Sequence, residues 1–262
     1  MTAHTSNLLV FASRIAALAM LPLALAGCMH YTTPGRGVTP VSLQGAQGDI
    51  RERLAREPAA QFPARMAVVR VQSPEYFTRT TSSYGSGRYS VVTTRDVEKE
   101  ESIQRIAKLP MIAGLAPLNR LLLQPQLSSD EDLRLAAASM KCDLLLIYTF
   151  DTGFRVDDVD VGPLTLISLG MLPTKTANVT ATASAAIFDV RTGYIYGLAE
   201  TTAKEAQIAS SWSTPAAIDQ ARQRAEGEAF DQLVEEFEKT WKGIVEQHAR
   251  TASVTAGMLQ SK

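Results

Sequence analysis

The sequence predicts an α/β fold: a mixed β-sheet with two short helices and a long C-terminal helix packed on it. Apolar, β-rich runs at residues 65–72 and 143–150 have the length and composition of buried strands. A run with period two over residues 179–187 is followed by the turn residues Asp189-Val190-Arg191-Thr192-Gly193, which is a hairpin pattern. After Thr214-Pro215, apolar residues recur at helical spacing to about Gln247, as in an amphipathic helix.

The first strand, at residues 65–72, ends before the turn-forming pair Ser73-Pro74. Residues 76–97 are rich in Thr, Ser, Tyr and Val, and Tyr84-Gly85-Ser86-Gly87 supplies a turn, so a hairpin is expected there. The two glycines lack the lysine and the strand-to-helix order of a phosphate-binding loop.

Two short helices and two more strands follow. Residues 96–108 have one charged and one apolar face, and Pro110 ends the pattern, so a short helix is predicted. A strand is expected through residues 118–123, and Ser128 or Ser129 caps a second helix. Residues 143–150 contain four consecutive apolar residues, which indicates the centre of the sheet.

The N-terminus predicts a signal peptide over residues 1–27. Arg14 is followed by an apolar run, residues 15–26, that is too short to span a bilayer. The run ends at Leu25-Ala26-Gly27-Cys28, which resembles the lipobox of bacterial lipoproteins and implies cleavage before Cys28 and lipid, including palmitate, on its thiol. The alternative is an ordinary signal peptide with an accidental cysteine. Met29 is not the aspartate that retains lipoproteins in the inner membrane, so the resemblance implies the outer membrane, facing the periplasm.

Three segments are predicted behind the signal peptide. Residues 28–62 form a lipid anchor and a flexible linker, rich in Gly, Pro, Thr, Gln and Arg, with a short helix over residues 49–57. Residues 63–248 form an α/β globular domain, and residues 249–262 a disordered tail. No second apolar stretch of spanning length is present, so the protein is expected to be anchored to the membrane without crossing it.

Composition excludes some partners and cross-links. Basic and acidic residues nearly balance, 26 against 27, and no basic stripe is visible, which argues against nucleic acid. If Cys28 carries lipid, Cys142 has no partner for a disulfide. Cys142 is expected to be a small buried hydrophobe, and a reactive thiol is the alternative.

Catalytic residues are not evident, so no catalytic site, cofactor or metal is predicted and the chain is not expected to be an enzyme. Cleavage of the predicted signal peptide removes His4, His30 lies beside the anchor and His248 lies near the end of the last helix, so no histidine is placed to serve a nucleophile. The motifs of serine hydrolases and zinc enzymes are absent. A pair of carboxylates acting as acid and base, as in glycosidases, is the alternative. Residues 157–160 contain three aspartates; they are expected to form a solvated turn, with calcium binding as the alternative.

Residues 161–173 form an apolar segment bracketed by glycine and proline. One interpretation is a loop or short helix folded onto the core, and the other is an exposed surface that binds a partner or a membrane. The side chains that would form this candidate partner surface are Leu164, Leu166, Ile167, Leu169 and Met171.

The strand at residues 141–147 and the hairpin at residues 186–196 together resemble the layout of periplasmic α/β lipoprotein domains. That group includes the curli-secretion channel subunit, lipoprotein activators of penicillin-binding proteins and the N-terminal domain of the Tol-system propeller protein. The layout is also similar to that of rhombotarget lipoproteins. The resemblance covers roughly residues 65–247 and implies a fold more than a function.

Two hypotheses for function follow. In the first, the chain is a lipid-anchored, non-catalytic binding or accessory module in the periplasm whose domain binds an envelope protein. In the second, it is a subunit of a homo-oligomeric envelope assembly or export apparatus, as the curli-like layout, the apolar segment at residues 161–173 and the long C-terminal helix indicate.

Overall fold

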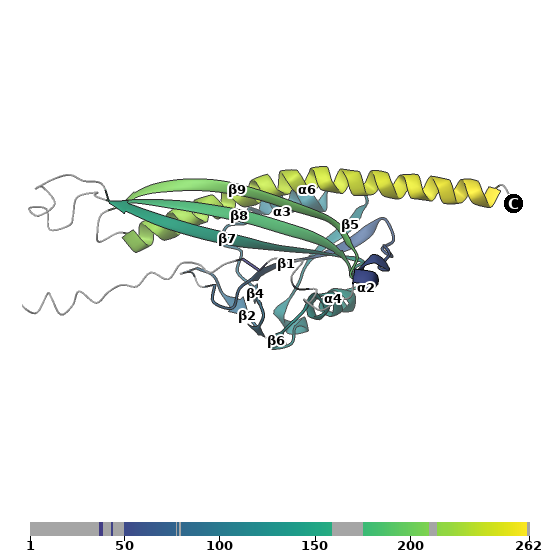
Figure 1. The fold of residues 1–262 in the computed structure, drawn as a ribbon, viewed down its shortest axis with the longest axis horizontal. Coiled ribbons are helices and arrows are strands. Elements are labelled where there is room, and N and C mark those ends of the chain that lie inside the picture. Colours follow the sequence, from purple (N-terminus) through teal and green to yellow (C-terminus); the bar gives the residue numbers. More distant parts are fainter. Residues whose placement is uncertain are drawn as a thin grey trace, which may run out of the picture. The chain divides into compact units, whose positions relative to one another are not determined.

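The computed structural model has the predicted α/β architecture (Figure 1), and it describes residues 37–38, 43, 50–76, 78, 80–158, 175–209 and 214–260. A seven-stranded mixed sheet has the order β2-β4-β1-β7-β8-β9, with β5 also paired to β1. Its strands are β1 (Ala64–Gln72), β2 (Ser83–Tyr84), β4 (Ser90–Val92), β5 (Ile112–Pro117), β7 (Leu144–Asp158), β8 (Lys175–Asp189) and β9 (Ile195–Ala209). Two residues each from β3 (Ser86–Gly87) and β6 (Gln126–Leu127) form a second, small sheet.

The helices are α2 (Ile50–Leu54), α3 (Glu100–Ala107), α4 (Asp130–Ser139) and α6 (Thr214–Gln260), with a 3-10 turn, η2, at Arg120–Leu122. The two predicted short helices are therefore confirmed as α3 and α4. Asp132 in the first turn of α4 accepts hydrogen bonds from the backbone N–H groups of Ser128 and Ser129, at 2.7 and 3.0 Å. This carboxylate satisfies backbone donors that would otherwise lack acceptors at the start of the helix.

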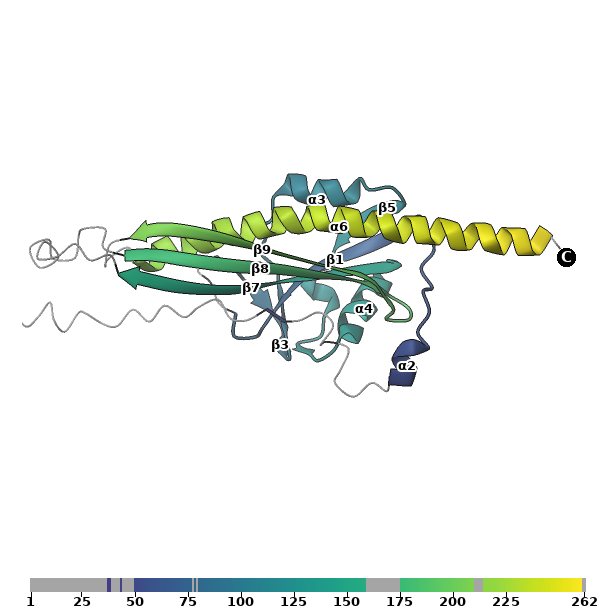
Figure 2. The same cartoon turned by 45° about the horizontal axis from the view of Figure 1, so that its top comes forward.

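β7 lies in the interior of the sheet, as its apolar run predicted. It runs parallel to β1, with Met66 opposite Leu144 and Arg70 opposite Tyr148. On its other side β7, β8 and β9 form an antiparallel meander of three strands of 15 residues each (Figures 1 and 2). The predicted strand ended at residue 150, but pairing with β8 continues it to Asp158.

Helix α6 covers one face of the meander and α4 packs on the other face of the sheet (Figure 2). The side chains that α6 packs against the sheet are small near the start of the helix and large further on. They are Ala221, Ala225, Ala229, Leu233, Phe237, Trp241 and Ile244. The small residues meet alternate residues of β8, among them Ala181, Ala183 and Ala185, so the helix approaches the sheet closely. Each large side chain that is fully buried here contributes about 1.5–3 kcal/mol.

The prediction of a strand through residues 118–123 is wrong. The strand lies earlier, at β5, and is followed by the 3-10 turn η2. Oδ1 of Asn119 accepts a hydrogen bond from the backbone N–H of Leu121 at 2.9 Å, which favours a turn over an extended chain. Leu121 and Leu122 are exposed, so the apolar run that indicated a strand is not buried.

The terminal segments differ from the sequence-based prediction. α6 continues to Gln260, where a disordered tail was expected from residue 249. Helical hydrogen bonds are local and no proline follows Pro215, so the helix extends beyond its packed stripe. Within the predicted flexible linker, Leu43 is buried in the core that α4 covers, and α2 matches the short helix expected over residues 49–57.

Candidate functional site

The edge of β1 divides between two partner strands. β5 runs parallel to residues 64–68 of β1, whereas β4 runs antiparallel to residues 70–72. β4 and β5 therefore lie along the same edge of β1 and run toward each other. Their C-terminal ends meet near Val69. The loops that leave strand ends at such a divergence commonly line binding crevices in α/β sheets.

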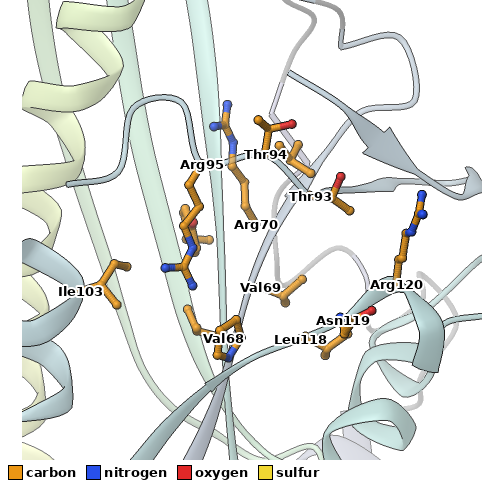
Figure 3. Close-up of a pocket in the computed structure, with 13 residues that line it drawn as sticks. Val68, Val69, Arg70, Thr93, Thr94, Arg95, Ile103, Leu118, Asn119 and Arg120 are labelled. Atoms are coloured by element: carbon orange, nitrogen blue, oxygen red, sulfur yellow. The ribbon is translucent and has the colours of Figure 1, made fainter. Parts of the chain in front are cut away.

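A cleft of about 350 Å³ lies at this point (Figure 3). Arg95, from the loop after β4, and Arg120, from the turn after β5, lie on opposite sides of it, and Val68, Val69 and Leu118 lie at its base. We call it the arginine-flanked cleft. Its lining residues are Val68, Val69, Arg70, Val92, Thr93, Thr94, Arg95, Ile103, Pro117, Leu118, Asn119, Arg120 and Tyr148.

The guanidinium groups of Arg95 and Arg120 are the cleft's main free donors. Arg120 is exposed and makes no ion pair with any described residue, and the contact of Arg95 with Glu100 is long, at 3.7 Å. The Thr93 hydroxyl donates to the carbonyl oxygen of Ser82 at 3.0 Å, whereas the Thr94 hydroxyl accepts from the N–H of Ser82 at 2.7 Å and can still donate its own proton. The cleft therefore offers a ligand two positive groups and the Thr94 hydroxyl above an apolar base.

Arg70 links the cleft to a cluster of charged side chains buried behind it. Its Nη1 atom lies 3.1 Å from Oδ1 of Asp96 and 3.3 Å from Oε1 of Glu98. Its Nη2 atom lies 3.5 Å from Oε2 of Glu226 and donates to Oη of Tyr76 at 2.7 Å. β1, the loop after β4 and helix α6 are thus joined through one guanidinium.

A second buried guanidinium, that of Arg222 on α6, completes the cluster. It contacts Asp96 at 2.9 Å, Asp219 at 3.0 Å and Glu226 at 2.7 Å. We call Arg70, Asp96, Glu98, Asp219, Arg222 and Glu226 the buried ionic cluster. Its members are at most 10 % exposed in their side chains, so they are only weakly screened by solvent.

Hydroxyl groups satisfy other oxygens of the cluster. Tyr148 donates to Oε1 of Glu98 at 2.9 Å, and Thr152 donates to Oε1 of Glu226 at 2.8 Å. Burial, together with the neighbouring charge of Glu98, raises the pKa of Tyr148 well above its usual value. Tyr148 therefore stays protonated and remains a hydrogen-bond donor.

Asp96 stays ionised in this environment. Burial by itself raises the pKa of Asp96, but the hydroxyl of Thr80 and the guanidinium groups of Arg70 and Arg222 outweigh it, and the pKa is below its usual value. Because Asp96 directly follows Arg95, this anchored carboxylate also fixes one wall of the cleft.

Metal and acid–base chemistry find little support in this part of the molecule. Among the described residues, no three His, Cys, Asp or Glu side chains are placed to hold a metal ion. His248, the one histidine within the described ranges, packs against the ring of Phe62, with ring centroids 4.5 Å apart. The carboxylates of the buried ionic cluster are engaged with guanidinium or hydroxyl groups.

None of the residues singled out from the sequence is among the residues that line the cleft. Cys28 and the candidate partner surface of Leu164, Leu166, Ile167, Leu169 and Met171 are outside the described residues. The turn expected over residues 157–160 is wrong for its first two residues, because Asp157 and Asp158 end strand β7. Asp157 accepts a hydrogen bond from Asn178 of β8 at 2.8 Å. The sequence did not point to Arg95, Arg120 or the buried ionic cluster. The signal that was present is Arg70 itself, an arginine within an otherwise apolar strand.

No protein-family model matches the chain, and a comparison with functionally curated proteins gave no match either. Among solved structures, the chain is similar to a Xanthomonas campestris protein of the DUF330 family, at 12% identity and a TM-score of 0.37, over 82% of this chain and 99% of that one. A Helicobacter pylori protein provisionally named a neuraminyllactose-binding hemagglutinin homolog matches at 8% identity and a TM-score of 0.35, over 80% of this chain and 97% of that one.

A Caulobacter crescentus protein provisionally named a lipoprotein matches at 12% identity and a TM-score of 0.26, over 42% of this chain and 76% of that one. At these identities and scores the three likenesses assign neither a family nor a function. They do not include the curli, penicillin-binding-protein activator or Tol proteins, so that resemblance stays a prediction. Within the described ranges, the chain contains no helix with the length and apolar character needed to span a bilayer.

Proposed function

We propose that the chain is a lipid-anchored protein of the cell envelope whose α/β domain is a non-catalytic binding module. The anchor is Cys28, and the preceding Leu25-Ala26-Gly27 supports its lipidation. Met29 favours the outer membrane over the inner one, with the domain facing the periplasm.

The observation that carries the proposed activity is the arginine-flanked cleft. Arg95 and Arg120 face a space of about 350 Å³, which is within the range of about 300–1,000 Å³ typical of ligand pockets. Guanidinium groups bind carboxylates through pairs of charge-assisted hydrogen bonds. The ligand is therefore an anion, and we assign it as a carboxylate on a peptide segment of another envelope protein.

The base of the cleft favours a peptide carboxylate over a free phosphate ion. Val68, Val69 and Leu118 present apolar surface there, which suits the methylene groups that carry a glutamate or C-terminal carboxylate. A small inorganic ion would leave this surface without contacts.

The buried ionic cluster would make the site rigid before the ligand arrives. Asp96, next to Arg95, is held by both Arg70 and Arg222, and Arg70 itself lines the cleft. A binding loop that is fixed in advance loses less conformational freedom when the ligand binds.

Fluorescence anisotropy with a labelled glutamate-rich hexapeptide tests the binding activity on the full-length protein in detergent. We expect saturable binding that weakens with added salt and falls at least tenfold in the double variant Arg95→Gln/Arg120→Gln. Lys108→Gln/Lys242→Gln, which removes two exposed positive charges away from the cleft, is the matched control and should bind as the wild type does. Equal affinity of the double variant and the wild type would refute the site.

The anchor has its own test. Cells grown with a clickable palmitate analogue should label the wild-type protein but not Cys28→Ala, and the variant should leave the membrane fraction. If Cys28→Ala remained labelled and membrane-bound, the lipid would be attached elsewhere.

A further inference from the structure

β9 is the terminal strand of the seven-stranded sheet and pairs, among the described strands, only with β8. Alternate residues such as Ala199 and Ala203 are buried beneath α6, and the residues between them are exposed on the opposite face. β9 has 15 residues, and beyond the register shift at Tyr196 an edge strand of this kind presents a row of backbone donors and acceptors to another chain.

From this edge we infer that the protein forms a homodimer in which β9 pairs with β9 of a second copy. The two strands run antiparallel about a two-fold axis at Thr202. Residues directly opposite each other in this register lie on the same face of the joined sheet, so α6 of both copies covers the same side.

Charge complementarity selects this register. With Thr202 opposite its own copy, Glu200 of each strand faces Lys204 of the other, so the pairing aligns opposite charges twice. A register centred on Glu200 or on Lys204 would place like charges opposite each other, which is destabilising. Neither side chain makes an ion pair with a described residue of its own chain, and Glu200 accepts one hydrogen bond, from the hydroxyl of Ser184 at 2.8 Å.

Exposed apolar side chains flank the charged pair and support the same register. Leu198 is 57% exposed and Ile208 is 67% exposed, although β9 is otherwise well packed against α6. The register places Leu198 opposite Ala206 of the second copy. Lysine on an edge strand commonly prevents such pairing, but here a symmetrically placed glutamate neutralises it.

Cysteine cross-linking of the full-length protein in native membranes tests the dimer. In the register centred on Thr202, the two Cα atoms of that residue lie about 4.5–5.5 Å apart, so Thr202→Cys should form an intermolecular disulfide in high yield under copper-phenanthroline oxidation. The two copies of residue 206 would lie roughly 27 Å apart, so Ala206→Cys should not cross-link. The wild-type chain, in which Cys142 is buried, sets the background.

Charge reversal then separates specific pairing from random collision. In the Thr202→Cys background, Glu200→Lys should lower the disulfide yield at least fivefold, and Glu200→Lys/Lys204→Glu should restore it. Thermal unfolding of each variant confirms that it is folded. The dimer is refuted if Thr202→Cys stays monomeric, if Ala206→Cys cross-links equally well, or if folded charge-reversed variants cross-link like the wild-type background.

Discussion

Nη2 of Arg222 lies 2.9 Å from Oδ2 of Asp96, so a buried side chain of α6 holds the loop that forms one wall of the arginine-flanked cleft. The same guanidinium contacts Asp219 and Glu226 within its own helix. Packing of the C-terminal helix and the shape of the cleft are therefore linked through Arg222.

Removing Arg222 should destabilise the fold strongly. Arg222→Met keeps most of the side-chain volume but leaves Asp96, Asp219 and Glu226 buried without their shared guanidinium, and breaking such a pair costs about 3–5 kcal/mol. The free energy of unfolding in urea measures the loss. Arg224 lies two residues after Arg222 and makes an exposed ion pair with Glu205. Arg224→Met removes that ion pair and should cost about 1 kcal/mol or less. Similar losses in the two variants would contradict a structural role for the cluster.

Asp96 should make stability depend on pH in the acid range. Its folded-state pKa is lowered because the Thr80 hydroxyl and the two guanidinium groups outweigh the effect of burial. Its contribution is therefore fully present above the unfolded-state pKa of about 3.9, and it is lost as the pH falls through the lower folded-state value.

Asp96→Asn should accordingly unfold at lower urea concentration than the wild type at neutral pH, with the difference narrowing below about pH 4. Urea titrations across this range measure both effects. A difference that stayed constant with pH would mean that the ionised form of Asp96 is not what stabilises the fold.

The turn between β8 and β9 should require glycine at position 193. Gly193 has φ of +69°, and its N–H donates to the carbonyl of Asp189 at 3.0 Å. Gly193→Ala should lower the free energy of unfolding by about 1–2 kcal/mol, because a β-carbon disfavours this backbone conformation. Gly243→Ala, in an exposed part of α6 with open space around the added carbon, should instead raise stability by about 0.5–1 kcal/mol.

Cys142 should behave as an inert buried thiol. It is 6% exposed, and burial raises the pKa of its thiol, which lowers the fraction of reactive thiolate. Alkylation by iodoacetamide at pH of about 8 should be slow in the folded protein and become fast in urea. Equally fast alkylation in both states would indicate a reactive site that the fold exposes.

Local patterns predicted most of the elements because their causes are local. The apolar run of β7, the alternation of β8 and the helical stripe of α6 each mark the face that is buried. The distal half of β7 was missed because its residues from Asp151 onward are partly polar and become a strand only through pairing with β8. Tertiary pairing of this kind overrides the local preference of a segment.

The candidate site could not be predicted because it depends on one edge of β1 pairing with two strands, β4 and β5. Arg95 and Arg120 are ordinary surface residues in the sequence, and only the fold brings them to one cleft. Arg70 was the detectable signal, since a buried guanidinium needs acidic partners, but its partners Glu98 and Glu226 are 28 and 156 residues away. No spacing rule connects residues so far apart.

The most direct test of peptide binding in the arginine-flanked cleft is nuclear magnetic resonance of the full-length protein, labelled with ¹⁵N-arginine, during titration with the glutamate-rich hexapeptide. We expect the side-chain Nε–H signals of Arg95 and Arg120 to shift together and to saturate, while that of Arg224, paired with Glu205 on the surface, stays in place. Absence of shifts at saturating peptide, or small shifts spread over exposed arginines, would contradict the assignment of the cleft as the binding site.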